Sequence, residues 1–141
     1  MKVTITIEID EKELSGVLQK NSKGCTPDGL SDYARVFNDS IPAWTKDQEY
    51  NLMYLRNREH YANDMLKIKG YLFLNEVYDM IGIPRTKAGN VVGWIYDEDH
   101  PNGDNFVDFG LADERNYDFM NGITATAILD FNVDGEILSK L

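Results

Sequence analysis

The sequence predicts an α+β fold, in which an N-terminal strand and helices precede a small antiparallel sheet of about three strands. Three observations support this class. Apolar and polar residues alternate at the start of the chain, one long stretch has helical periodicity, and short apolar runs after residue 90 are separated by turn residues. Alternation and helical spacing in separate parts of a chain are typical of α+β proteins.

The first third is predicted to hold one strand and two helices. Residues 3–9 alternate between aliphatic and polar side chains, as in a half-buried strand. Asp10, with Glu13 three residues later, is expected to begin a helix that ends at Gly24, and residues 24–29 have a loop composition. A second, short helix is expected to carry Tyr33, Val36 and Phe37 and to end near Asn38.

Residues 46–68 are predicted to form one long amphipathic helix. Thr45 and Gln48 have the spacing of a capping box, and Gly70 is expected to end the helix. Residues at steps of three, four and seven form the expected apolar face: Tyr50, Tyr54, Leu55, Tyr61, Ala62, Met65, Leu66 and Ile68. The expected polar face consists of Arg56, Glu59, Asn63 and Lys67.

The part after Gly70 is predicted to contain short elements. Asn75 is expected to cap a short helix that ends at Gly82, and strands are expected at residues 91–96, 106–111 and 124–133. A polar turn is expected at residues 97–104 and a helical turn at residues 117–120. Residues 1–141 are expected to form a single domain, with a subdomain boundary near Gly70 between residues 1–69 and 70–141.

The composition narrows the class of protein. The chain has 141 residues, of which 43% are hydrophobic, as in an ordinary globular domain. No apolar run is long enough to cross a bilayer, and the first residues do not resemble a signal peptide. The single cysteine, Cys25, cannot form an internal disulfide, so we expect a cytoplasmic protein.

The net charge of −10 is concentrated in the last third of the chain. Residues 1–96 hold 13 acidic and 12 basic residues, whereas residues 97–141 hold 11 acidic and 2 basic residues. Such a surface repels nucleic acids and anionic membranes and attracts basic protein surfaces. The predicted partner-binding residues are Asp97, Glu98, Asp99, Asp104, Asp108, Asp113, Glu114 and Asp118. A role in solubility alone is the alternative interpretation.

The residues that could carry chemistry do not form a catalytic set, so we expect a non-enzymatic protein. Cys25 with His60 or His100 is the single thiol–imidazole combination that the sequence offers, and nothing in the spacing brings these residues together. Residues 85–89 form a small basic loop that could hold a phosphate, but they lack the glycine spacing of a nucleotide-binding loop.

Two acidic stretches could bind a cation. Residues 130–137 have the first half of a calcium-loop pattern, but its twelfth position is Leu141 instead of glutamate, which favours a strand that enters an Asp–Gly turn. Residues 97–104 hold four acids and His100 in one turn, where solvation is the simpler interpretation. We therefore predict no metal and no cofactor.

Motifs in the second half resemble a known protein family. The motifs are Gly70-Tyr-Leu-Phe-Leu-Asn-Glu-Val-Tyr-Asp79, Gly82-Ile-Pro-Arg-Thr-Lys-Ala-Gly89, Val92-Gly-Trp94 and Asp130-Phe-Asn-Val-Asp-Gly135. Together they resemble the C-terminal part of an uncharacterised protein family of tailed bacteriophages and prophages of Gram-positive gut bacteria. The resemblance covers about residues 63–138. Many relatives begin with a hydrophobic segment, which this chain lacks. The resemblance implies a viral or mobile-element origin and no particular activity.

Three hypotheses for the function follow. The first is a phage or prophage protein that acts in the bacterial host cytoplasm and binds a basic surface of a nucleic-acid-handling complex, such as a CRISPR effector, as a nucleic-acid mimic. The second is a virion or morphogenesis component, because the aromatic-rich helix suits self-association into a homo-oligomer. The third is a small-ligand or metal-binding module that uses residues 85–89 or 130–135.

Overall fold

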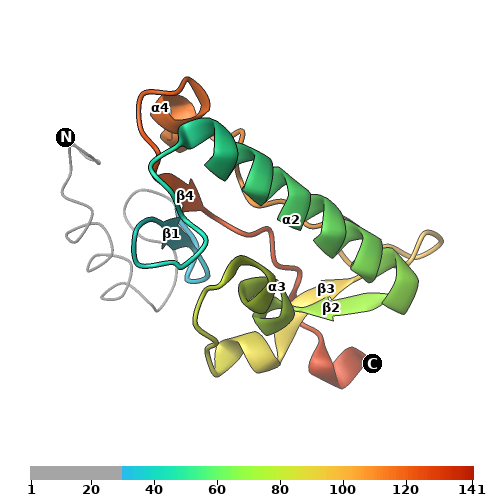
Figure 1. The fold of residues 1–141 in the computed structure, drawn as a ribbon. Helices are drawn as coiled ribbons and strands as arrows, with labels where there is room; N and C mark the ends of the chain where they lie inside the picture. The colour runs from blue at the N-terminus through green and yellow to red at the C-terminus, as the bar shows by residue number, and fades with distance from the viewer. Residues whose placement is uncertain (1–29) are drawn as a thin grey trace.

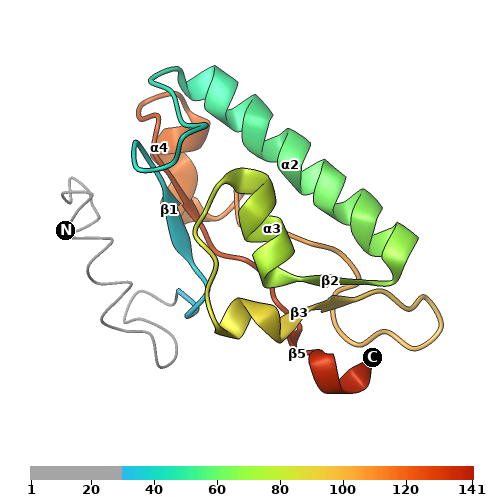
Figure 2. The ribbon, with the colours of Figure 1, turned by 60° about the horizontal axis from the view of Figure 1, so that its bottom comes forward.

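The structure is a computed structural model that describes residues 30–141. The predicted strand at residues 3–9, the first helix and Cys25 lie outside this range. The long helix α2 (Gln48–Lys69) lies along one edge of the molecule, and the two small sheets and helix α3 (Leu74–Ile81) pack on one side of it (Figures 1 and 2). The predicted α+β class, with a long helix followed by short antiparallel strands, is confirmed.

Helix α2 has nearly the predicted ends but a different cap. Asp47 is the N-cap, and its Oδ1 accepts from the backbone N–H groups of Glu49 (3.0 Å) and Tyr50 (3.3 Å). Thr45 instead supports the preceding turn, because its Oγ1 accepts from the N–H of Asp47 (3.1 Å). Gly70 ends the helix, as predicted, with a φ of 84° that glycine adopts without strain.

The buried face of α2 is rotated relative to the prediction. The buried residues are Asn51, Leu55, Ala62 and Leu66, whereas three predicted core residues, Tyr50, Tyr61 and Ile68, are about half or more exposed. Two predicted surface residues, Glu59 and Asn63, are half-buried against residues 107–109. Leu55, Ala62 and Leu66 were also predicted for the apolar face and are buried, so the prediction holds for the aliphatic side of that face and fails for its three exposed residues.

The three-stranded sheet has the order β2-β3-β5, and both of its pairs are antiparallel. It consists of β2 (Tyr71–Phe73), β3 (Val92–Ile95) and β5 (Gly135–Glu136). Leu72 faces Trp94 across the first pair, and Gly93 faces Gly135 across the second. Strand β3 confirms the predicted strand at residues 91–96, whereas β2 was not expected from the sequence.

The second sheet pairs β1 (Arg35–Phe37) with β4 (Ala127–Leu129) in antiparallel register. The predicted short helix around Val36 and Phe37 is therefore wrong, because Val36 pairs with Ile128 and Phe37 with Ala127. Only the middle of the predicted strand at residues 124–133 is a strand. It pairs with the beginning of the described chain instead of joining the three-stranded sheet.

The short elements at the end of the chain complete the fold. Three 3-10 helices, η1 (Ala88–Asn90), η2 (Glu114–Asn116) and η3 (Leu138–Lys140), accompany α4 (Tyr117–Met120), which confirms the predicted helical turn. Asn75 lies inside α3 and does not cap it. The cap of α3 is Phe73, whose N–H donates to Glu76 Oε2 (2.9 Å).

One buried cluster includes residues from both sides of Gly70. Phe37 and Leu55 pack in it with Trp94, Phe109 and Phe131. Trp94 is fully buried, and its Nε1 donates to Asn132 Oδ1 (2.9 Å). Within residues 30–141, no helix combines the length and the apolar composition that a bilayer crossing requires.

Candidate functional site

The eight predicted partner-binding acids lie on one extended segment, residues 97–118, which we call the acidic segment. It runs beside α2 in the opposite direction. At one end the N–H of Tyr96 donates to Gly70 O (2.9 Å), and at the other Gln48 Nε2 donates to Phe119 O (2.6 Å). The acidic segment therefore spans the whole of α2, whose 22 residues are about 33 Å long.

The middle of the acidic segment is held by side chains of α2. Asn63 binds both backbone groups of Val107, since its Oδ1 accepts from the N–H (2.8 Å) and its Nδ2 donates to the carbonyl (3.0 Å). One turn earlier, Glu59 Oε2 accepts from the N–H of Phe109 (2.8 Å). The helix thus satisfies backbone groups that a neighbouring strand would otherwise satisfy.

This attachment explains why residues 106–111 do not form the predicted strand. On the other side, Asn132 Oδ1 accepts from the N–H of Asp108 (2.7 Å), and Asn132 Nδ2 donates to Phe106 O (2.9 Å). Apolar residues do alternate here, and Val107, Phe109 and Leu111 are buried. The alternation of apolar residues correctly predicts which side chains are buried. The backbone, however, forms its hydrogen bonds with the side chains of Asn63, Glu59 and Asn132 instead of with a partner strand.

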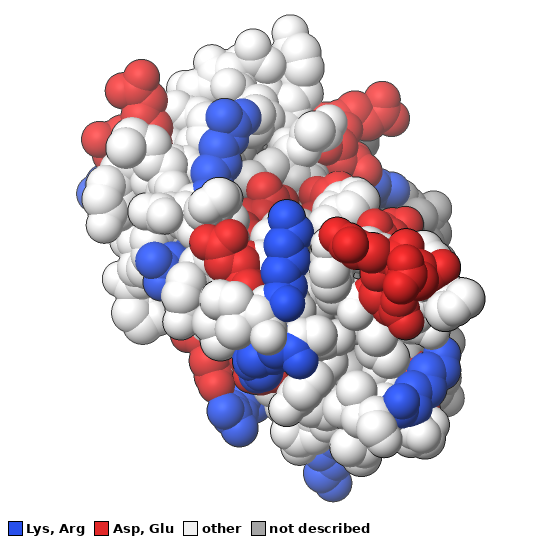
Figure 3. Space-filling view, turned by 90° about the vertical axis from the view of Figure 1, so that its right-hand side faces the viewer, with Lys and Arg blue, Asp and Glu red and all other residues white. Residues whose placement is uncertain are grey.

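All eight predicted acids are exposed. Four of them, Asp97, Glu98, Asp99 and Asp104, lie in one turn near the C-terminal end of α2, and the other four follow toward α4. They do not merge into one compact patch. Figure 3 shows the acidic side chains of one face in several groups, separated by uncharged surface and by Lys and Arg side chains.

The first group of acids lies in the turn that follows β3. Asn105 closes this turn by binding both backbone groups of Asp97, at 3.1 and 3.0 Å, and it adopts a φ of 65° that asparagine tolerates. Asp97 Oδ1 accepts from the N–H groups of Asp99 (3.0 Å) and His100 (3.1 Å). These bonds fix the backbone that presents the exposed carboxylates.

The remaining acids follow the segment toward α4. Asp108 Oδ1 accepts from the N–H of Gly110 (2.8 Å), and Asp113 caps η2 and forms an ion pair with Arg115 (3.0 Å). By contrast, within residues 30–141 the side chains of three acids form no hydrogen bond and no ion pair: Asp99, Glu114 and Asp118. These three carboxylates are available to a partner without any loss to the fold.

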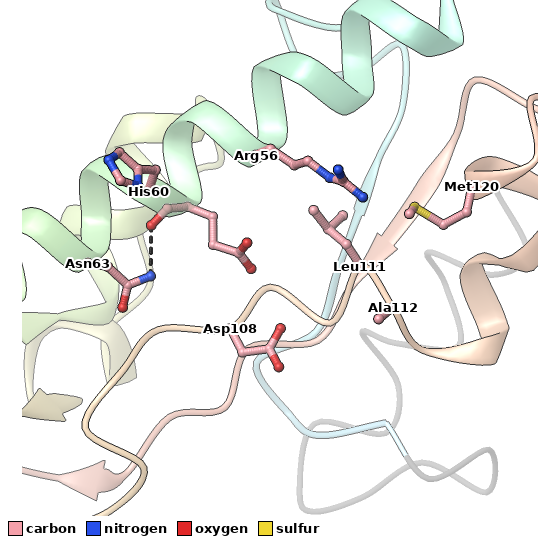
Figure 4. A pocket seen from close by; sticks show the side chains of 8 residues that line it. Arg56, His60, Asn63, Asp108, Leu111, Ala112 and Met120 are labelled. Carbon is pink, nitrogen blue, oxygen red and sulfur yellow. Dashed lines mark hydrogen bonds between the residues drawn. The ribbon is translucent and has the colours of Figure 1, made fainter.

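A groove of about 430 Å³ lies at the seam between α2 and the acidic segment. Arg56 and His60 reach it from the helix, Asp108 and Leu111 from the acidic segment, and Met120 from α4 (Figure 4). Glu59 also lines the groove. Burial raises the pKa of Glu59; the N–H of Phe109 lowers it, the Asp108 charge raises it and Arg56 lowers it.

The calcium-like stretch at residues 130–135 is distributed among different elements. Asp130 Oδ1 accepts from the hydroxyl of Ser31 (2.6 Å), and Asp134 Oδ2 accepts from the N–H of Ile95 (3.0 Å). Asn132, between them, binds the acidic segment. Because the three side chains bind separate parts of the chain, they do not converge on one point, and residues 30–141 contain no cluster of three or more potential metal ligands.

The other sequence candidates have structural contacts. Arg85 forms an ion pair with Asp79, and the backbone of its loop is held by Asn75, whose Oδ1 accepts from the N–H of Thr86 (3.0 Å). His60 is exposed and lies 3.5 Å from Asp64. The thiol–imidazole combination involves Cys25, which lies outside the described residues.

Sequence reasoning located the acids but missed the residues that hold them. Asn63 and Glu59 were placed on a polar helix face, and Asn116 was given no role. Asn116 is buried, donates to Ile128 O (2.8 Å) and accepts from the N–H of Ile128 (2.7 Å). The spacing of apolar and polar residues does not identify these three residues, because a single side chain that binds the backbone produces no repeating pattern in the sequence.

Comparison with known proteins places the chain in a family. The family model described as "Family of unknown function (DUF6353)" matches residues 2–141, and the chain belongs to this family. No curated protein and no solved structure matches the chain. The family model covers both halves of the sequence, and its description names no activity.

Proposed function

We propose that this chain is a binding protein whose acidic segment meets a basic, nucleic-acid-binding surface of another protein. The observation that carries the proposal is the attachment of eight exposed carboxylates along the full length of α2. A surface that binds a nucleic-acid backbone recognises negative charge before it reads any base. Carboxylates held at fixed positions offer that charge without the cost of ordering a flexible chain.

We further propose that the protein is encoded by a phage or prophage and acts in the host cytoplasm as an inhibitor of a nucleic-acid-handling defence complex. The motifs of residues 63–138, which resemble tailed-phage proteins, support this origin. A CRISPR effector is one complex with a suitable basic channel. The acidic segment would occupy that channel in place of the nucleic acid, so the protein itself would not bind DNA or RNA.

The test compares two triple variants with the same net charge. The first, Asp99→Asn/Glu114→Gln/Asp118→Asn, removes three acids of the acidic segment whose side chains form no hydrogen bond and no ion pair within residues 30–141. The control with the same charge change, Asp39→Asn/Asp64→Asn/Glu136→Gln, removes three exposed acids elsewhere, of which Asp64 lies 3.5 Å from His60 and Glu136 accepts from the hydroxyl of Ser139. Each protein is immobilised and exposed to a nuclease-treated bacterial lysate, and the captured proteins are identified by mass spectrometry.

We expect the wild type and the control to capture nucleic-acid-binding proteins that are released by excess duplex DNA or by raising the salt from about 0.1 M to 1 M. The first variant should lose them. Equal capture by both variants, or capture that duplex DNA does not compete with, would rule out mimicry by the acidic segment.

A structural role in a virion or in morphogenesis is the second candidate. The exposed apolar side chains on α2 favour it, since virion components require surfaces for assembly. Finding the protein at a fixed copy number in purified particles would support this role over inhibition of a host complex.

A further inference from the structure

Helix α2 has a second apolar stripe on its solvent side. Tyr50, Met53, Tyr61 and Ile68 are 50, 71, 46 and 77% exposed. At about 100° per residue, the four side chains lie within a sector of about 80°, whose centre is about 150° from that of the buried face. Figures 1 and 2 show α2 at the outer edge of the molecule, with no described element over its outer side. Exposed apolar side chains that are aligned on one face of a helix mark an interaction site.

The charges beside this stripe specify the direction of a partner helix. Glu49 and Lys67 are both exposed and are 18 residues apart, which is five full turns, so they lie on the same side of the stripe. Within the described part of the chain, neither forms an ion pair. Two antiparallel copies of α2 would place each Glu49 beside Lys67 of the partner subunit, whereas in a parallel pair the same residues of the two copies would lie on opposite sides of the contact and form no such pairs.

We propose that a second copy of this chain covers the stripe, with the two α2 helices antiparallel about a two-fold axis. In this arrangement Tyr50 packs against Ile68 of the partner subunit, and the contact occurs twice. Part of the stripe is already ordered, because the guanidinium of Arg58 lies 5.6 Å from the ring centroids of both Tyr54 and Tyr61. A preordered tyrosine loses less entropy on binding.

The size of the stripe predicts a reversible dimer. Covering the exposed parts of its four side chains removes roughly 500 Å² per subunit, or about 1,000 Å² in total, which is the lower limit for a specific interface. Asn57 and Asp64 interrupt the stripe with polar groups, which lowers affinity but fixes register in paired helices. A weak, concentration-dependent dimer is therefore expected instead of an obligate one.

This interface does not depend on the proposed function. Glu59 and Asn63, which hold the acidic segment, lie on the flank of α2 about 120–160° away from the centre of the stripe. If the protein binds a basic partner but stays monomeric, only the dimer proposal fails. If it forms the dimer but binds no basic partner, only the proposed function fails.

The first experiment is sedimentation velocity of the full chain over a range of concentrations. We expect a reversible monomer–dimer equilibrium that Ile68→Ser weakens by more than tenfold, about the effect of losing two buried aliphatic contacts. The matched control is Leu138→Ser, which changes a residue that is 52% exposed in η3, on the side of the molecule away from α2 (Figure 2). A monomer at all concentrations, or equal effects of both substitutions, would overturn the proposal.

The second experiment tests the antiparallel direction. Glu49→Lys and Lys67→Glu should each weaken the dimer by about tenfold at low salt, because each creates two like-charge contacts. The double variant Glu49→Lys/Lys67→Glu should recover the wild-type affinity, since both pairs are restored with their signs exchanged. Additive losses in the double variant would exclude the antiparallel pairing.

Discussion

Asn63 holds the acidic segment with both ends of its side-chain amide. It accepts from the N–H of Val107 and donates to its carbonyl, as a neighbouring strand would. Asn116 does the same for Ile128 in β4. Asparagine is suited to this role because a single amide carries a donor and an acceptor at fixed geometry. At the residue scale, therefore, amide side chains organise the part of the protein that has few strands.

Replacing Asn63 should destabilise the protein and loosen the acidic segment. We expect Asn63→Ala to lower the free energy of unfolding by about 1–3 kcal/mol, because two backbone groups of Val107 lose their partners. The measurement is urea denaturation, and Asn57→Ala, on the exposed face of the same helix, is the control. An equal effect of the two substitutions would show that the amide does not hold the segment.

Glu59 should make the stability depend on pH. Because burial raises its pKa in the folded state, the folded protein binds this proton more tightly than the unfolded chain does. The resulting stabilisation is present at a pH below the ordinary glutamate pKa, and it is lost as the pH rises through the raised pKa of the folded state.

The effect of Glu59→Gln follows from this pH dependence, because glutamine is uncharged at every pH. At neutral pH the variant should be more stable than the wild type, and the difference should shrink toward pH 4. Unfolding free energies measured by urea denaturation across this range test the prediction, and Glu49→Gln, at an exposed position of the same helix, is the control. A variant that is less stable at neutral pH would contradict it.

At the scale of elements, the chain brings β2 and β3 unusually close at Gly93. A Cβ at this position would overlap the carbonyl oxygen of Leu72 and the Cα of Phe73, both of which are backbone atoms. Strand β2 cannot move away without breaking its pairing with β3, since Phe73 is the registered partner of Gly93. Glycine is therefore required here by packing.

Gly93→Ala should lower the stability by about 2–3 kcal/mol, the usual cost of overpacking. In a domain of this size, that loss corresponds to a decrease in Tm of roughly 10 °C. Thermal denaturation followed by circular dichroism provides the measurement. An unchanged Tm would mean that β2 and β3 have more freedom than their close approach indicates.

The elements differ in how well the sequence predicts them. Residues 46–68 were assigned correctly, because local spacing and Gly70 determine a helix and its end. The strand pairing was not predictable, since β1 pairs with β4, which lies about 90 residues further along the chain. Residues 106–111 alternate like a strand, yet their backbone binds Asn63 and Asn132, and alternation does not reveal what the backbone binds.

At the scale of the whole molecule, the charge is asymmetric. The acidic segment carries eight acids and one basic residue, a net charge of −7 over 22 residues. The location of this charge along the chain is evident from the sequence, and in the structure all eight acids are exposed. Its arrangement along α2 could not be predicted, because contacts between residues far apart in the sequence determine it.

Mutual repulsion along the acidic segment should make the stability depend on salt. We expect the variant Asp99→Asn/Glu114→Gln/Asp118→Asn to be more stable than the wild type at low ionic strength, because three repelling charges are removed. The advantage should disappear as salt approaches about 1 M, where the Debye length is about 3 Å. Thermal denaturation at several salt concentrations tests this. A stability difference that is independent of salt would contradict repulsion as its cause.

The attachment of the acidic segment to α2 also determines the order in which the protein can fold. The bonds from Asn63, Glu59 and Gln48 close loops of 44, 50 and 71 residues. A helix forms locally within about a microsecond, whereas contacts at such separations must first overcome the entropy of loop closure. Helix α2 therefore acts as a template on which the acidic segment is assembled late, and a chain still emerging from the ribosome would acquire its negative surface only after residue 119 has been made.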